Sequence, residues 1–109
     1  MTFATVASVS ELVDDEPLAV DIDDELAVAI VRHDGNLYAI EDECSHGRVP
    51  LSEGDVEDGT IECYLHGSRF ELATGKVLNL PATEPVRVFP VRISGDDIQV
   101  DTDHPITDF

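Results

Sequence analysis

The sequence predicts an all-β fold, and three observations lead to that prediction. Apolar and polar residues alternate in several short segments, which is the period of a half-buried strand. Turn residues separate these segments at close spacing, as they do in antiparallel sheets. No stretch longer than about two turns follows the 3.6-residue period of an α-helix. With 109 residues, the chain is long enough for one domain, 1–109, and too short for two.

The first expected elements are a strand, a helical turn and a second strand. Residues 2–7 alternate and predict a strand. Ser8 and Glu11 have the spacing of a capping box, which predicts one helical turn before Pro17. Residues 18–22 predict the next strand.

A hairpin is expected next, followed later by a final pair of strands. Residues 26–32 and 37–41 predict two strands, and Asp34-Gly35 between them is a strong hairpin signal. Residues 86–93 predict one long strand that turns into a last strand at 98–101. We interpret the remaining residues, 102–109, as a tail.

The middle of the chain, residues 42–85, breaks this pattern. Only residues 60–62 and 69–72 predict short strands there, and glycine and proline interrupt the rest. Long loops inside a compact small domain usually carry function. We therefore expect a functional subdomain at about 42–85, and both cysteines of the chain lie in it.

The charge of the chain excludes several partners. It has 24 acidic and 6 basic residues, for a formal net charge of −18. Nucleic acid and an anionic membrane surface are excluded as partners, because both attract basic proteins. The longest apolar run is residues 26–31, so we expect no membrane span, no signal peptide and a cytoplasmic protein. The acidity itself fits a docking face for basic partners, a high-salt cytoplasm or a solvated surface.

Two cysteine–histidine pairs are the candidate metal ligands. Cys44 precedes His46 by two positions, and Cys63 precedes His66 by three, with sixteen residues between the pairs. Four such ligands on two loops can close a metal site. Zinc accepts this set, although zinc sites usually group cysteine with cysteine. One thiolate and one imidazole on each loop suit two unlike irons, which is the arrangement of a Rieske [2Fe–2S] centre.

These residues resemble the Rieske signature, and the branch they resemble is the small soluble ferredoxins of bacterial ring-hydroxylating dioxygenases. Further similarity lies at residues 50–54, 68–76, 80–82 and 89–93. The resemblance implies a Rieske-type antiparallel β-sandwich with a cluster-binding subdomain of two loops. It implies that Cys44 and Cys63 hold the inner iron, and that His46 and His66 hold the outer iron. It also implies that residues 80–82 form a proline loop covering the cluster.

The function implied by the resemblance is one-electron transport without catalysis. The chain would take electrons from a flavin-dependent ferredoxin reductase and pass them to a Rieske oxygenase. Two other hypotheses stay open: the small Rieske-like subunit of an assimilatory nitrite reductase, and a zinc-stabilised interaction domain.

Departures from the family pattern refine these expectations. Val49 and Leu65 occupy the positions of two cysteines that form a disulfide in respiratory Rieske proteins, and we expect them to pack together. Ser68 occupies the position of a hydroxyl that donates to a cluster sulfur in high-potential members, whereas Phe70 replaces the second such donor.

The remaining polar residues have plainer interpretations. His33 and His104 are expected to be ordinary surface histidines, and residues 21–25 a solvated acidic turn without the spacing of a calcium loop. Residues 41–43 are three acids directly before Cys44. They form either a solvated loop or a negative charge that disfavours reduction and contacts a basic partner.

Overall fold

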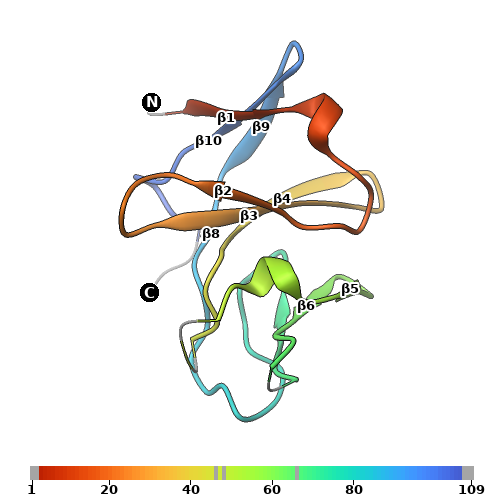
Figure 1. Cartoon of the computed structure of the whole chain (residues 1–109), viewed down its shortest axis with the longest axis vertical. Coiled ribbons are helices and arrows are strands. Elements are labelled where there is room, and N and C mark those ends of the chain that lie inside the picture. Colours follow the sequence, from red (N-terminus) through yellow and green to blue (C-terminus); the bar gives the residue numbers. More distant parts are fainter. Residues whose placement is uncertain (1–2, 46, 48, 66, 107–109) are drawn as a thin grey trace.

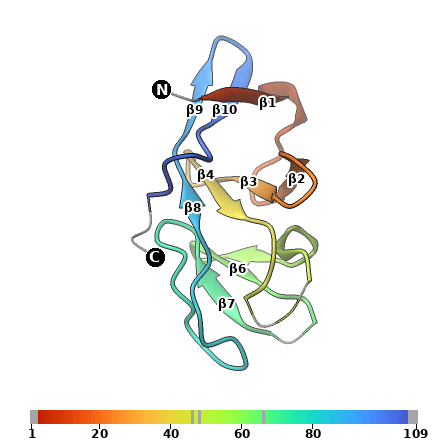
Figure 2. The ribbon, with the colours of Figure 1, turned by 90° about the vertical axis from the view of Figure 1, so that its left-hand side faces the viewer.

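The expected all-β fold is confirmed by the computed structural model (Figures 1 and 2), which describes residues 3–45, 47, 49–65 and 67–106. Those residues form ten strands and two short 3-10 helices, and every strand pair is antiparallel. The strands are β1 (Ala4–Ser8), β2 (Leu18–Asp21), β3 (Ala27–His33), β4 (Asn36–Glu41), β5 (Val56–Glu57), β6 (Thr60–Glu62), β7 (Arg69–Glu71), β8 (Val88–Phe89), β9 (Val91–Ser94) and β10 (Asp97–Val100); the 3-10 helices are η1 (Val9–Glu11) and η2 (Leu51–Glu53).

The strands form three sheets that follow one another along the longest axis of the molecule. The first sheet has the order β1-β10-β9, the second β2-β3-β4-β8 and the third β5-β6-β7. Both views place the second sheet between the other two (Figures 1 and 2). The first two sheets make the sandwich, and the third lies at the opposite end with the cysteine loops.

The continuous apolar run of β3 follows from its position between two cores. Val28 and Ile30 belong to a buried cluster that the second sheet shares with the first. Ala29 and Val31 belong to a second buried cluster, on the side of the third sheet. Successive side chains of a strand point to opposite faces. A strand buried on both faces therefore needs apolar residues throughout rather than alternation.

Two short-range predictions are confirmed. Asp34 and Gly35, with φ of 52° and 78°, form the turn that joins β3 to β4. Positive φ at both positions is what a type I′ hairpin turn requires. Ser8 and Glu11 form the predicted capping box at η1, since the Ser8 N–H donates to the Glu11 carboxylate at 2.8 Å.

The single strand expected at residues 86–93 is wrong, because Pro90 divides it. β8 pairs with β4 in the second sheet, whereas β9 pairs with β10 in the first. Proline has no N–H to donate to a strand ladder, so the chain leaves one sheet and enters the next at this residue. The sequence analysis also missed β5, whose two residues are too few to show alternation.

The expected tail is wrong for its described part, residues 102–106. Asp101 is only 4% exposed, and its carboxylate accepts the N–H of Asp103 at 3.0 Å. The Ile106 N–H then donates to the carbonyl of Val88 in β8 at 2.7 Å. A buried carboxylate thus turns the chain back onto the second sheet.

Candidate metal centre

The first cysteine loop is closed by backbone hydrogen bonds. The Cys44 N–H donates to the Val49 carbonyl at 2.8 Å, which joins positions five residues apart. Inside this loop the Gly47 N–H donates to the Cys44 carbonyl at 3.1 Å, and the Val49 N–H donates to Gly47 at 2.8 Å. The loop follows β4 and Asp42, so the end of the second sheet positions its cysteine.

The second cysteine loop has the same closure. The Cys63 N–H donates to the Ser68 carbonyl at 2.8 Å, again across five positions, and the Gly67 N–H donates back to the Cys63 carbonyl at 2.8 Å. Gly67 has a φ of +79°, which glycine adopts without steric cost. Because Glu62 pairs with Arg69, the loop is the connection of the β6–β7 hairpin. Its position is therefore set by the register of the third sheet.

Both cysteines are buried in the same place. Cys44 is 1% and Cys63 0% exposed, and both belong to the buried cluster on the side of the third sheet, which also contains Leu51 and Ala82. Two loops from different sheets therefore bring two thiols into one water-poor region. The thiols are the donors that iron–sulfur clusters use.

The two histidines of the predicted set lie outside the described residues. His46 and His66 are not described, and neither is Arg48. Within the described ranges no three His, Cys, Asp or Glu residues converge on one point as metal ligands would. The four-residue ligand set consequently remains a prediction.

A third segment, which includes the predicted proline loop of residues 80–82, is bonded to both cysteine loops. The Ala82 N–H donates to the Ser68 hydroxyl at 2.9 Å, and the Ser45 hydroxyl donates to the Glu84 carbonyl. Ser68 is fully buried. One short segment thus connects to the first loop through Glu84 and to the second through Ala82.

Asn79 adds two hydrogen bonds between this segment and the second cysteine loop. The sequence analysis did not identify Asn79 as a residue of the site. Its side-chain amide donates to the Gly67 carbonyl at 2.9 Å, while its oxygen accepts the Arg69 N–H at 2.8 Å. Both partners are backbone groups at the exit of the second loop. No signal in the sequence identifies such an asparagine, because the pairing joins residues ten and twelve positions apart.

The expected packing of Val49 against Leu65 is wrong for Leu65. Val49 is half-buried and packs against the cluster of buried residues around the cysteines, whereas Leu65 is 56% exposed. Leu65 lies in the tight turn of the second loop beside Tyr64, which is 53% exposed. The backbone closure of that turn holds both side chains at the surface.

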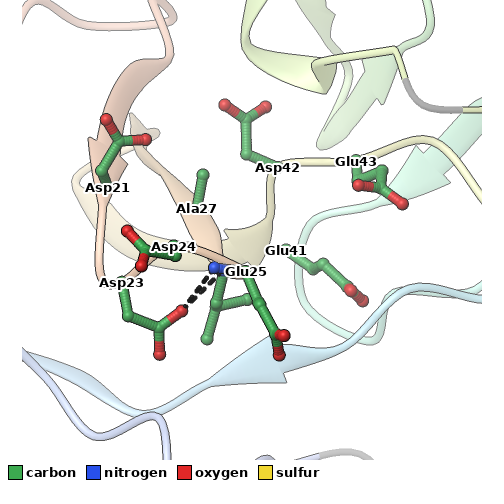
Figure 3. Close-up of a pocket in the computed structure, with 9 residues that line it drawn as sticks. Asp21, Asp23, Asp24, Glu25, Ala27, Glu41, Asp42 and Glu43 are labelled. Carbon is green, nitrogen blue, oxygen red and sulfur yellow. Dashed lines mark hydrogen bonds between the residues drawn. The ribbon is translucent and has the colours of Figure 1, made fainter.

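An acidic pocket borders the start of the first loop (Figure 3). Its walls are the β2–β3 turn and the segment before Cys44, and it is lined by Asp21, Asp23, Asp24, Glu25, Leu26, Ala27, Glu41, Asp42 and Glu43. Figure 3 shows Asp23 accepting the N–H groups of its own turn, at 2.8 and 2.9 Å.

Two further carboxylates of this pocket are engaged by the protein itself. Asp42, 8% exposed, accepts both the N–H and the hydroxyl of Ser52, at 2.6 and 2.7 Å. Glu41 pairs with Arg87 at 3.2 Å. These bonds fix the chain that enters the first loop.

The other two histidines lie away from the cysteine loops. His33, at the end of β3, contacts Asp15 through Nδ1 at 2.6 Å. The hydrogen bond to the Asp15 carboxylate, with the nearby charge of Asp34, raises the pKa of His33 above its usual value. His104 contacts the buried Asp101 at 2.9 Å. His104 is exposed, in line with the sequence expectation, whereas the His33 side chain is only 16% exposed.

The fold and the site together define a class of protein. Two buried thiols on equivalent loops, a buried hydroxyl and a third covering segment suit a thiolate-bound cluster placed at one end of an antiparallel β-sandwich. The chain matches the family model described as Rieske [2Fe-2S] domain over residues 2–90. It belongs to the Rieske [2Fe–2S] domain family. The cluster of this family supplies reversible one-electron transfer.

Relatives with assigned roles agree with this membership. The chain is 45% identical over 102 residues to the biphenyl dioxygenase ferredoxin subunit of Pseudomonas sp. (strain KKS102), with 93% of each chain covered. It is 48% identical over 84 residues to the 3-phenylpropionate/cinnamic acid dioxygenase ferredoxin subunit of Escherichia coli (strain K12), covering 76% of this chain and 79% of the relative.

Solved structures agree as well. The Sphingomonas yanoikuyae B1 ferredoxin matches with a TM-score of 0.86 and 30% identity, over 93% of this chain and 99% of that one. A chain in the complex of reduced oxygenase and oxidized ferredoxin in carbazole 1,9a-dioxygenase matches with a TM-score of 0.83 and 32% identity, covering 90% and 91%. A putative NADH-dependent nitrite reductase small subunit from Mycobacterium tuberculosis matches with 0.80 and 25%, covering 91% and 93%.

The protein is therefore a Rieske ferredoxin, an electron carrier rather than a catalytic enzyme, and its cofactor is a [2Fe–2S] cluster. The zinc hypothesis is not supported. No helix among the described residues has the length and apolar character needed to cross a membrane.

Proposed function

We propose that this ferredoxin takes electrons singly from a flavin-dependent reductase and delivers them to the terminal Rieske oxygenase of a ring-hydroxylating dioxygenase. In this proposal Cys44, His46, Cys63 and His66 hold the cluster, within a subdomain of about residues 42–85 of the single Rieske domain 1–109. The oxygenase is supported by the relatives, which are ferredoxin subunits of dioxygenases. The reductase is the electron source that a carrier without catalytic function requires.

One observation carries the site assignment. Cys44 and Cys63 are buried in one cluster of residues, and each opens a loop closed to the residue five positions later. In the sequence, the histidine of each pair falls between the two residues that close its loop. Equivalent loops supplying one thiolate and one imidazole each are what a mixed-ligand [2Fe–2S] centre needs.

A cytoplasmic location is part of the same proposal. Cysteines must be reduced thiolates to bind iron, and the cytoplasm is the compartment that keeps thiols reduced.

The ligand set is tested by substitution in anaerobically purified protein. Cys44→Ser and Cys63→Ser should lose the two irons and two sulfides per chain of the wild type, because serine is a harder and poorer ligand for iron–sulfide clusters. His46→Cys and His66→Cys should change the visible and EPR spectra toward those of a four-cysteine cluster. His33→Gln is the matched control and should keep the Rieske spectrum. A Rieske spectrum in either His→Cys variant would contradict the ligand set.

The electron path is tested by reconstitution with the reductase and oxygenase of the biphenyl dioxygenase system of strain KKS102. Wild-type ferredoxin should restore NADH-dependent biphenyl oxidation, whereas Cys63→Ser should not. No turnover with a fully loaded wild-type cluster would contradict the proposal.

The small subunit of a nitrite reductase is the second candidate, and the likeness to the Mycobacterium tuberculosis subunit favours it. The higher identity to dioxygenase ferredoxins favours the first candidate. Purification from the native cells distinguishes the two. Stable association with a sirohaem protein would identify a reductase subunit, whereas a ferredoxin should be recovered without it.

A further inference from the structure

Ser68 carries a buried hydroxyl next to a proposed cluster ligand. The residue is fully buried, and its side-chain oxygen accepts the Ala82 N–H at 2.9 Å. Its carbonyl accepts the Cys63 N–H at 2.8 Å, so Ser68 closes the loop that Cys63 opens. The hydroxyl also has one proton to donate, and among the described residues no hydrogen bond takes it up. The sulfur atoms of a cluster bound to Cys63 are acceptors for such a proton.

Asn79 binds the peptide groups on both sides of Ser68. Its side-chain amide donates to the Gly67 carbonyl at 2.9 Å, and its oxygen accepts the Arg69 N–H at 2.8 Å. The Gly67 carbonyl belongs to the peptide plane before Ser68, and the Arg69 N–H belongs to the plane after it. Only the φ and ψ of Ser68 separate these two planes, because each peptide bond is rigid. Fixing both planes therefore fixes the direction in which the Ser68 side chain leaves the backbone.

The peptide before Ser68 depends on Asn79 more than the peptide after it does. The later peptide is also held by the hydrogen bond from the Cys63 N–H to the Ser68 carbonyl. For the earlier peptide, the bond from Asn79 is the only hydrogen bond that the described residues provide. Gly67 precedes this peptide with a φ of +79°, and glycine restricts backbone rotation least. Without Asn79 the earlier peptide is free to rotate, and the Ser68 side chain turns with it.

Asn79 is held by the third sheet rather than by the loop that it binds. The Leu78 N–H donates to the Arg69 carbonyl at 2.8 Å, and Val77 forms a β-bridge with Phe70 of β7. The backbone is therefore fixed up to the residue before Asn79. A side chain that a fixed backbone presents loses little conformational freedom when it forms its bonds.

We propose that Asn79 is a positioning residue of the metal centre. By fixing the peptide before Ser68, it keeps the buried hydroxyl in the orientation from which its proton acts on the cluster. A hydrogen bond to a cluster sulfur favours the reduced, more negative state, so Asn79 raises the midpoint potential through Ser68. An exposed amide thus controls a buried donor. This inference rests on the cluster site of the proposed function above.

The experiment is a double-mutant cycle of midpoint potentials, measured by protein-film voltammetry on fully loaded holo-ferredoxin. Asn79→Ala should lower the midpoint potential of the wild type, by no more than Ser68→Ala does. In the Ser68→Ala background, Asn79→Ala should cause no further shift, because the hydroxyl through which Asn79 acts is already gone. Two residues that acted independently would instead give shifts that add.

Gln99→Ala is the matched control. Gln99 in β10 also accepts one hydrogen bond, from Arg92 at 2.7 Å, and donates one, to Thr5 at 3.3 Å. It lies in the first sheet, at the opposite end of the molecule from the cysteine loops (Figure 1), so its loss should leave the potential unchanged.

Two further variants of Asn79 make the test independent of one substitution. Asn79→Gln retains both groups of the amide and should return the potential toward the wild-type value. Asn79→Ser removes both bonds with a different side chain and should match Asn79→Ala. Every variant should keep the Rieske EPR spectrum, since Asn79 is not proposed as a ligand.

Failure of this inference is distinguishable from failure of the proposed function. An unchanged potential in Asn79→Ala, or an equal shift with and without the Ser68 hydroxyl, would overturn the role of Asn79 and leave the carrier function intact. Wild-type protein without a Rieske EPR spectrum would overturn the ligand set, and the inference with it. The potentials are measured without reductase or oxygenase, so they do not depend on which partners the ferredoxin serves.

Discussion

Ser68 is the residue in the second cysteine loop from which we predict an effect on the reduction potential. Ser68 is fully buried, and its oxygen already accepts the Ala82 N–H. A hydroxyl has one proton to donate, and beside a cluster that proton favours the reduced, more negative state. We expect the acids of residues 41–43 to act in the opposite direction, because negative charge opposes the addition of an electron.

We expect a midpoint potential in the lower half of the Rieske range, which spans about −150 to +300 mV. Ser68→Ala should lower it further, because the donor is lost. Protein-film voltammetry measures both values. Ser45→Ala is the matched control, since that hydroxyl donates to the Glu84 carbonyl instead. A potential that Ser68→Ala leaves unchanged would show that this hydroxyl does not act on the cluster.

His33 makes stability depend on pH at a distance from the metal centre. Its pKa is raised in the folded protein, first by the hydrogen bond to the Asp15 carboxylate. Folding therefore favours the protonated ring. The resulting stabilisation is complete below the unfolded pKa of about 6.5, and it is lost as pH rises through the higher folded pKa. The melting temperature of the wild type should exceed that of His33→Gln most at pH 5.5 and least at pH 9. A gap that widens toward alkaline pH would contradict this sign.

At the scale of the element, close backbone contacts between segments limit which residues can replace glycine in the loops. Gly75 and Gly59 have nearly the same φ, +75° and +76°. A Cβ at Gly75 would lie 1.9 Å from the Val86 carbonyl oxygen, whereas a Cβ at Gly59 meets nothing within 4 Å. The Val86 N–H also donates to the Gly75 carbonyl at 3.0 Å, which ties the covering segment to the third sheet.

These two glycines form a matched pair. Gly59→Ala should cost about 1–2 kcal/mol of unfolding free energy, the usual penalty of a left-handed conformation. Gly75→Ala should cost distinctly more, because Val86 must move and its hydrogen bond weakens. Chemical denaturation of the two variants measures the difference. Equal losses would mean that the approach of Val86 is not a tight constraint.

At the scale of the whole molecule, net charge opposes compactness. A charge of −18 is confined within principal extents of 39 × 26 × 22 Å. Many of these charges are therefore separated by distances comparable to the Debye length of about 10 Å at 0.1 M salt. Their mutual repulsion destabilises the folded state at low ionic strength.

The melting temperature should therefore rise between 10 mM and 300 mM NaCl and then level off. Asp24→Asn should raise it at low salt only, since screening removes the same repulsion at high salt. A rise that continues into the molar range would instead favour the high-salt hypothesis for the acidity. A melting temperature independent of salt would show that repulsion is not important in this protein.

The sequence by itself determined the features that depend on neighbouring residues. The Asp34-Gly35 turn, the Ser8–Glu11 capping box and the cysteine–histidine pairs are local, because side-chain chemistry and backbone freedom within a few residues decide them.

The tertiary structure alone decided features that join distant segments. Pro90 divides a predicted strand because β8 and β9 pair in different sheets, and Asn79 bonds backbone groups of another loop. Leu65 is 56% exposed, although the sequence led us to expect it to pack against Val49. Periodicity carries no information on which segments meet, since that choice depends on the packing of the whole chain.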